Sequence, residues 1–316
     1  MSGSGSPSGH AATADTAVDP AVDTTAGRGP NRAAGEAAAP RRADWTIDQG
    51  WADYTAAQHA VWQTLFDRQT RLLPGRACDA FVDGMRALPM GREAIPNFHA
   101  LNEVLMRHTG WQLVAVPGLV PDEVFFAHLA QRRFPAGNFI RQAHQLDYLE
   151  EPDVFHDVFG HVPMLMNPVM ADFIQAYGEG GLRAQRLGML DKLARVYWYT
   201  VEFGLVQQAD GLRIYGAGIA SSFTETVFAL DDASPNRVRF ELERVMRTLY
   251  RIDDFQETYF VLDSLDALLE LARIDFAPLY AGAAAAAEIE PGQLLLSDAV
   301  LHAGTGIRHP IRKPSA

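Results

Sequence analysis

The sequence predicts a mainly α-helical protein with a few short strands, folded as a single domain. Three observations support this. Segments with apolar residues three and four positions apart recur along most of the chain and are separated by Gly or Pro. Segments with strand character are short and few. The 316 residues are 48% hydrophobic with one cysteine, so a large core can form without disulfides.

The composition changes abruptly near Asp44. Residues 1–43 contain no Leu, Ile, Phe, Tyr or Trp and are rich in Ala, Gly, Ser, Thr and Pro. Such a segment has little to bury, which predicts a disordered tail. All five Trp and nearly all large apolar residues follow, which predicts one folded domain over residues 44–300. The polar residues 301–316 predict a frayed C-terminal tail.

Apolar spacing defines the individual elements. We predict helices over residues 54–73, 77–88, 98–109, 121–133, 168–178, 187–208 and 264–273. We predict strands over residues 111–116, 212–215 and 257–261. The helix over residues 187–208 carries a continuous apolar stripe, so we expect it to be buried.

Charge and composition exclude several classes of protein. The formal charge of −12, without a basic stripe, argues against nucleic acid as a partner. No apolar run approaches the roughly 20 residues of a membrane span, and the first residues lack a signal-peptide core. The single cysteine, Cys78, is typical of a reducing compartment. These features predict a cytoplasmic protein in which any metal is held by His and carboxylates.

One thirteen-residue segment, EPDVFHDVFGHVP, combines two imidazoles with three carboxylates. Its histidines, His156 and His161, are five residues apart, which is about 140° around an ideal α-helix. An uninterrupted α-helix would therefore not let both bind one ion. We expect a helix that begins at Pro152 and Asp153 to unwind at Gly160, which would bring His161 round toward His156.

A third ligand is expected from an acid whose position is otherwise unexplained. Glu202 is an isolated acid among aromatic and aliphatic residues of a helix expected to be buried. Glu225 is a weaker candidate because its hydroxyl-bearing neighbours could satisfy it. Two histidines and Glu202 would form a 2-His-1-carboxylate triad with open positions on ferrous iron. Zinc accepts the same ligands, so a zinc hydrolase is an alternative.

Residues from about 45 to about 280 resemble the pterin-dependent aromatic amino acid hydroxylases. The resemblance rests on EPD at 151–153, HDVFGHVP at 156–163, YWYTVEFGL at 197–205 and YGAGIASSF at 215–223. It implies a hydroxylase catalytic domain in which His156, His161 and Glu202 are the catalytic Fe(II) ligands. The implied activity is hydroxylation of L-phenylalanine to L-tyrosine in phenylalanine catabolism. O2 and tetrahydrobiopterin, or a related reduced pterin, would be the co-substrates.

The resemblance also implies how the pterin is bound. The pterin ring would stack on Phe125, and Gly118, Leu119 and Val120 would contact it through their backbone. Asp157 would face the pterin from beside the iron.

The substrate contacts implied by the resemblance come from other segments. Arg141 would grip the α-carboxylate of the amino acid, and Ser221 would assist it. Trp198 and Pro152, together with the ring of His156, would shape the aromatic pocket. Asp153 is the expected partner that holds Arg141 still.

Several alternatives remain open at this point. Pocket walls decide which amino acid is accepted, so a tryptophan, tyrosine or phenylalanine-3 hydroxylase is possible within the family. A catalytically inactive homologue that acts as a binding module is a further alternative. The N-terminal tail is too short and polar for the regulatory domain of animal members, and the C-terminus lacks a long heptad helix. These features predict a monomer.

Overall fold

Helices account for most of the computed structural model, which describes residues 41–147 and 151–306. The α-helices are α1 (Ala56–Leu72), α2 (Asp79–Ala87), α3 (Phe98–His108), α4 (Asp122–Ala130), α5 (Val162–Leu165), α6 (Pro168–Leu187), α7 (Leu190–Tyr197), α8 (Ala217–Ala220), α9 (Phe223–Asp231), α10 (Leu242–Arg247), α11 (Ala267–Arg273) and α12 (Ala277–Ala285). Short 3₁₀ helices are η1 (Trp51–Asp53) and η2 (Ala143–Gln145), and π-helices are η3 (Phe155–His161) and η4 (Trp198–Glu202). The strands are β1 (Gln112–Val116), β2 (Arg133–Gly137), β3 (Leu205–Gln208), β4 (Gly211–Ile214), β5 (Asn236–Arg239), β6 (Thr258–Leu262) and β7 (Val300–His302). The prediction of a mainly helical fold with a few short strands is confirmed.

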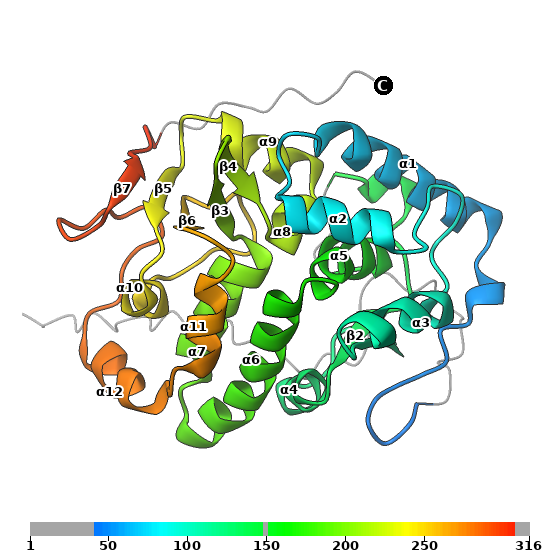
Figure 1. Ribbon diagram of the computed structural model, residues 1–316, viewed down its shortest axis with the longest axis horizontal. Helices are drawn as coiled ribbons and strands as arrows, with labels where there is room; N and C mark the ends of the chain where they lie inside the picture. The colour runs from blue at the N-terminus through cyan, green and yellow to red at the C-terminus, as the bar shows by residue number, and fades with distance from the viewer. Residues whose placement is uncertain (1–40, 148–150, 307–316) are drawn as a thin grey trace, which may run out of the picture.

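The strands form two small sheets on either side of the long helix α6 (Figure 1). Strands β1 and β2 pair in parallel. The larger sheet has the order β4-β3-β6-β5-β7, in which β6 is parallel to both its neighbours and the two outer pairs are antiparallel. In Figure 1 the larger sheet lies at the upper left, and β2 lies with α3 and α4 at the lower right.

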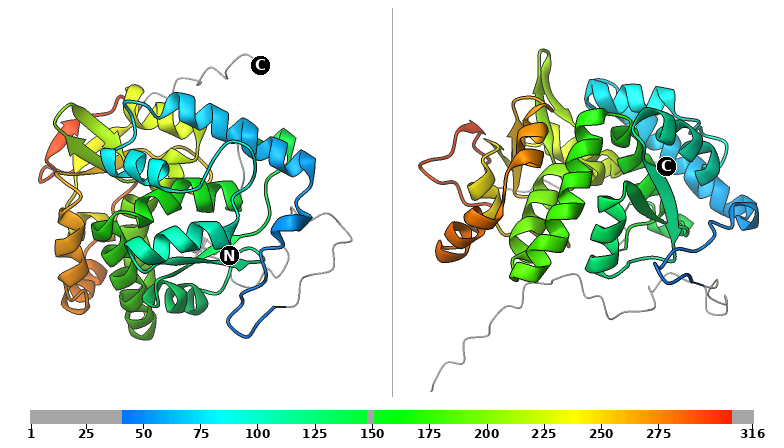
Figure 2. Two further views of the ribbon diagram at one scale, coloured as in Figure 1. Left: turned by 45° about the vertical axis from the view of Figure 1, so that its right-hand side comes forward. Right: turned by 60° about the horizontal axis from the view of Figure 1, so that its bottom comes forward.

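Helix α6 lies between the two sheets, where it packs against α4 on one side and α11 on the other (Figures 1 and 2). The Asn167 side chain caps its first turn, and Gly188 ends it with a φ of 68°. The close approach of α4 requires glycine: a Cβ at Gly181 would lie 2.1 Å from the Phe126 ring. This contact holds α4 against α6.

The helix predicted over residues 187–208 was wrong at its C-terminal end. Helix α7 stops at Tyr197, the chain continues as the π-helix η4, and residues 205–208 form strand β3. A Cβ at position 204 would lie 2.2 Å from the ring of Tyr215. Glycine is therefore required at Gly204, where the chain enters the strand. Pairing with β4 and β6 then outweighs the local helical spacing.

Other differences have similar tertiary causes. Helix α6 continues to Leu187, beyond the predicted end at residue 178, because its glycines serve close packing and not termination. Strands β2, β5 and β7 were not predicted, and each is a short segment that depends on pairing with distant residues. Within residues 41–147 and 151–306, no helix has the length and apolar character needed to span a membrane.

The C-terminal segment is attached to the larger sheet beyond the predicted domain end at residue 300. Strand β7 pairs with β5, and the N–H groups of Thr305 and Gly306 donate to the carbonyls of Ala233 and Ser234. The prediction placed residues 301–306 in a frayed tail, whereas the structure shows this segment hydrogen-bonded to the domain. Residues 1–40 and 307–316 of the two predicted tails lie outside the described residues.

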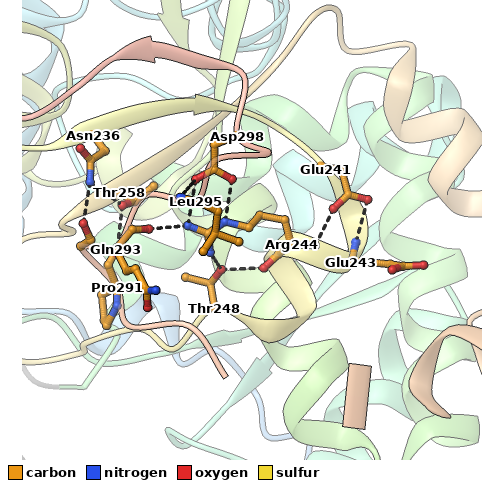
Figure 3. A network of polar contacts seen from close by, with 11 residues as sticks. Asn236, Glu241, Glu243, Arg244, Thr248, Thr258, Pro291, Gln293, Leu295 and Asp298 are labelled. Carbon is orange, nitrogen blue, oxygen red and sulfur yellow. Dashed lines mark hydrogen bonds and ion pairs between the residues drawn. The ribbon is translucent and has the colours of Figure 1, made fainter. Parts of the chain in front are cut away.

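A buried ion pair holds this segment in place (Figure 3). The side chains of Arg244, on α10, and Asp298 are 4% and 3% exposed, and the Nε to Oδ1 distance is 2.9 Å. Arg244 also donates to the carbonyl of Gln293 at 2.6 Å, and Asp298 accepts the Leu295 N–H at 2.8 Å. The guanidinium of Arg244 thus binds the segment before β7 to helix α10.

We expect Asp298→Ala to destabilise the protein by about 3–5 kcal/mol, because it leaves the buried Arg244 charge unpaired. Urea unfolding followed by circular dichroism measures the change. The matched control is Asp263→Ala, since Asp263 pairs with Arg239 on the surface, where such pairs contribute at most about 1 kcal/mol. Equal losses in the two variants would contradict the structural role of the buried pair.

Candidate metal centre

The first two candidate ligands lie on the π-helix η3. A π-helix closes i to i+5 hydrogen bonds, so residues five apart come close to one face, which an α-helix does not allow. His156 and His161 consequently point the same way, and their Nε2 atoms are 3.2 Å apart. The predicted unwinding at Gly160 was wrong, because the chain remains helical through Gly160 and into α5.

Gly160 has a packing role in this arrangement. A Cβ at this position would lie 2.9 Å from the carbonyl oxygen of Ala217 in α8. Helix α8 therefore lies directly against η3, and glycine is required for the close approach. This contact brings the residues that follow Ala217 next to the two histidines.

Glu202, the third candidate ligand, ends the second π-helix, η4. Its Oε1 is 3.2 Å from His161 Nε2, and its Oε2 is 3.6 Å from His156 Nε2. One ligand atom from each of the three residues falls within 4.8 Å of the others. Among the described residues this is the group of His, Cys, Asp and Glu side chains close enough to hold one ion.

Glu225, the competing acid, is satisfied elsewhere. It is buried on α9, where one carboxylate oxygen accepts hydrogen bonds from the Tyr259 hydroxyl and from the backbone N–H of Gln256. These two partners come from segments distant along the chain. Glu225 does not belong to the metal-binding group.

Ser221 sets the tautomer of His156. The Ser221 hydroxyl donates its proton to the Ala217 carbonyl at 2.8 Å, and His156 Nδ1 lies 2.9 Å from the same oxygen. The hydroxyl has one proton, so Nδ1 must carry the hydrogen of the imidazole and donate it. The Nε2 lone pair is then free and directed at His161 and Glu202, as metal binding requires.

The electrostatics of the site suit a cation. Burial lowers the pKa of His156 to about 4, against the opposing effect of Glu202, so this imidazole is neutral at pH 7. Burial acts to raise the pKa of Glu202, but the two imidazoles and the Tyr197 hydroxyl outweigh it and leave the pKa below its ordinary value. A neutral imidazole and an ionised carboxylate are the forms that ligate metal.

We expect Ser221→Ala to weaken metal binding or lower activity by about 10–100-fold, because the ring of His156 loses the acceptor that fixes its orientation. Metal content after dialysis against a graded chelator series measures the affinity. Ser222→Ala is the matched control, since Ser222 caps α9 and does not contact the histidine. Equal metal affinity in wild type and Ser221→Ala would contradict the orienting role.

Asp157 lies between the metal centre and the smaller sheet. Its Oδ2 accepts the backbone N–H of Gly137, at the end of β2, at 2.7 Å. Burial raises the pKa of Asp157 to about 7, although this hydrogen bond acts in the opposite direction. The carboxyl group therefore fixes η3 to β2 and can change protonation near neutral pH. The expected contact with the pterin stays a prediction.

Arg141 is buried beside the metal centre and is held by Asp153. Its Nε and Nη2 atoms each lie 2.9 Å from one oxygen of Asp153, which is the expected partnership. Burial acts to raise the pKa of Asp153, but Arg141 reverses this and holds the pKa below its usual range. Asp153 also accepts the backbone N–H of His156 at 3.1 Å, so the guanidinium and the first ligand are positioned by one carboxylate.

The residues assigned to the pterin lie on α4 and on the loop that precedes it. The Phe125 ring makes an edge contact with Tyr197, with ring centroids 6.1 Å apart. Gly118 has a φ of 152°, and a Cβ there would lie 2.5 Å from Glu151. Leu119 is exposed, and its N–H donates to the same glutamate at 3.3 Å. Val120 is partly buried.

Trp198 opens the π-helix that carries Glu202. Its indole stacks on Tyr250 with a centroid distance of 4.4 Å and an interplanar angle of 18°. Pro152 is partly buried one residue before Asp153. Trp198 and the ligand Glu202 thus belong to the same short helix.

Tyr197 lies beside the metal ligands, with its ring centroid 6.5 Å from that of His161. Its hydroxyl helps to lower the pKa of Glu202, and its ring packs on Tyr177 at 4.8 Å as well as on Phe125. Tyr197 is the last residue of α7, and Glu202 ends η4, five residues later.

These features define a mononuclear metal centre of the 2-His-1-carboxylate class in a helical domain, with an arginine and an aromatic cluster beside it. Comparison with known proteins agrees. The profile of the biopterin-dependent aromatic amino acid hydroxylases matches residues 37–277. The chain belongs to this family.

Individual relatives are similar over most of their length. The phenylalanine-4-hydroxylase of Caulobacter vibrioides is 64% identical over 264 residues, which cover 84% of this chain and 90% of that protein. The crystal structure of Chromobacterium violaceum phenylalanine hydroxylase with bound oxidised Fe(III) matches with a TM-score of 0.81 and 56% identity, covering 83% of this chain and 96% of that one. A second structure of the same enzyme, with iron(III) and oxidised 7,8-dihydrobiopterin, matches with a TM-score of 0.80 and 56% identity over 83% and 95%.

Proposed function

We propose that the protein is a phenylalanine 4-monooxygenase, which converts L-phenylalanine to L-tyrosine with O2 and a tetrahydropterin at an Fe(II) centre. The observation that carries the proposal is the convergence of His156, His161 and Glu202 from two π-helices. The 64% identity to a phenylalanine-4-hydroxylase supports the choice of substrate.

The donor set fits ferrous iron. Two neutral imidazoles and one carboxylate leave open positions on the metal, which is the arrangement of non-haem Fe(II) oxygenases. When bound, the iron and the reduced pterin together activate O2 so that one oxygen atom is inserted into the substrate ring. The hydrogen bond to Ser221 fixes the ring of His156, so this imidazole keeps one orientation toward the metal.

Substrate binding is assigned to the residues beside η3. Arg141 would bind the α-carboxylate with the N–H groups that remain after its two bonds to Asp153 and its longer bond to the Leu146 carbonyl. Because Asp153 also accepts from the backbone of His156, the carboxylate of the amino acid would be held at a defined distance from the ligand. Trp198 and Pro152 would form the wall that excludes water from the aromatic ring.

Pterin binding is assigned to Phe125 and to the backbone of Gly118, Leu119 and Val120. Phe125 contacts Tyr197, and the ring centroid of Tyr197 lies 6.5 Å from that of the ligand His161, so a ring stacked on Phe125 would lie on the metal-ligand side of α4. Asp157 would approach the same ring from η3, where its pKa of about 7 lets it donate or accept a hydrogen bond.

Reconstitution tests the function. The protein is loaded with Fe(II), supplied with tetrahydrobiopterin and O2, and given phenylalanine, tyrosine or tryptophan in separate reactions. We expect tyrosine from phenylalanine, in proportion to pterin oxidised, and the highest kcat/KM for phenylalanine. The same protein loaded with zinc should form no product. Preference for tryptophan or tyrosine would reassign the substrate, and no pterin-dependent product from any of the three would refute the hydroxylase.

We further propose that the enzyme acts as a cytoplasmic monomer. The described residues after α10 form strands β6 and β7 and the two short helices α11 and α12, and none of these is a long heptad helix of the kind that joins subunits. Light scattering during gel filtration tests the prediction. A mass equal to a single chain over a hundredfold range of concentration is the expected result, and a concentration-dependent mass would contradict it.

A further inference from the structure

Gln256, in the chain between α10 and β6, is buried and makes hydrogen bonds at both ends of its amide. Its Nε2 donates to the carbonyls of Arg251 at 2.9 Å and Asp254 at 3.4 Å. Its Oε1 accepts the indole N–H of Trp198 at 2.8 Å. The two carbonyls can only accept, so the NH2 group must face them and the amide oxygen must face Trp198. The amide cannot flip.

The indole of Trp198 is therefore constrained in two independent ways. Tyr250 stacks on its face, and Phe203 packs against it with centroids 4.7 Å apart. These contacts restrict tilting of the ring. The hydrogen bond to Gln256 restrains its position in the plane of the ring.

The backbone of Gln256 is tied to the helix that follows Ser221. Its N–H donates to Glu225 Oε1 at 3.4 Å, and the Tyr259 hydroxyl donates to the same oxygen. Glu225 lies on α9, four residues after Ser221, which holds the ring of His156. The segment from Ser221 to Glu225 thus supports the ring of His156 directly and the indole of Trp198 through Gln256.

We propose that Gln256 is a positioning residue that sets the shape of the aromatic substrate pocket by holding the indole of Trp198. This inference rests on the proposed function, in which Trp198 lines that pocket. Gln256 does not touch the substrate or the metal. Without the amide oxygen of Gln256, the indole N–H of Trp198 loses its acceptor and the ring loses its in-plane restraint. The pocket then accepts phenylalanine less well and discriminates less against the larger tryptophan.

The test compares Gln256→Leu with Gln207→Leu, which alters an exposed glutamine on β3. We expect the KM for phenylalanine to rise about tenfold in Gln256→Leu, the size of effect expected when one buried hydrogen bond is lost. The KM for tetrahydrobiopterin and the iron content should stay within about twofold of wild type. The ratio of kcat/KM values for phenylalanine over tryptophan should fall. Gln207→Leu should match wild type throughout.

Two further measurements separate positioning from a general structural role. In the background of Trp198→Phe, which has no indole N–H, adding Gln256→Leu should change the KM for phenylalanine by less than about twofold. In ¹⁵N NMR, the Trp198 indole signal, assigned by its loss in Trp198→Phe, should shift in Gln256→Leu. The indoles of Trp62 and Trp111, bonded to the carbonyls of Gly91 and Ala171, should not. If the Leu variant does not fold, Gln256→Met, which keeps the length of the side chain, replaces it.

An unchanged KM for phenylalanine in Gln256→Leu would overturn the inference. So would an equal rise in both KM values with loss of iron, or full additivity in the Trp198→Phe background. A wild-type enzyme that hydroxylates no aromatic amino acid would instead refute the proposed function. That result is visible before any Gln256 variant is made.

Discussion

Replacing Glu202 with Gln is expected to leave the protein folded but without iron. The amide keeps the volume of the side chain, so packing in η4 should survive. It removes the single negative charge among the three ligand atoms, so two neutral imidazoles alone would face a dication. The loss of activity should exceed the roughly 100-fold that follows removal of an outer hydrogen-bond partner of a metal ligand.

Metal content after anaerobic loading and gel filtration measures this effect, with circular dichroism to verify folding. Glu225→Gln is the control with the competing acid, and it should retain iron because Glu225 bonds Tyr259 and Gln256. Full iron occupancy with activity in Glu202→Gln would move the ligand role to another acid.

Replacing Arg141 is expected to have the second largest effect, on amino acid binding. Arg141→Ala should lower kcat/KM for phenylalanine by roughly 100-fold, through KM, since hydrogen bonds to a charged partner contribute about 1.5–3 kcal/mol. The KM for the pterin should change little. The physical reason is that the guanidinium is already oriented by Asp153 and presents its free N–H groups without further ordering.

Arg141→Ala also leaves Asp153 buried without its cation, so a second variant separates binding from stability. Arg141→Lys keeps the charge near Asp153 but lacks the planar fork, and it should show most of the KM effect with less loss of stability. Arg76→Lys, at a surface pair with Asp231, is the matched control. Equal rises in the KM values of amino acid and pterin would contradict the assignment of Arg141 to the substrate carboxylate.

The metal-binding set could be predicted from the sequence because its members are chemically conspicuous. His156 and His161 lie in one acid-rich segment. Glu202 is an isolated acid among aromatic and aliphatic residues. The partnership of Arg141 with Asp153 was also expected and is present. Residue types and their immediate neighbours were sufficient for these predictions, because an isolated charge in an apolar segment needs a partner.

The manner in which these residues meet could not be predicted in the same way. A spacing of five was interpreted as requiring a break at Gly160, whereas the chain forms a π-helix and Gly160 admits α8. The π form lacks a distinct local propensity and is kept by its surroundings, which here include the contact with Ala217 and the hydrogen bond that His156 donates to Ser221.

The sequence alone established a mainly helical chain with an acidic, cysteine-poor body and a candidate site for iron at His156, His161 and Glu202. Periodicity and unusual charge placement are local properties, so they can be read without coordinates. Tertiary structure decided the strand over residues 205–208, the two π-helices and the contact of Gln256 with Trp198. Each of these depends on partners distant along the chain, and long-range pairing and packing outweigh local preference wherever that preference is weak.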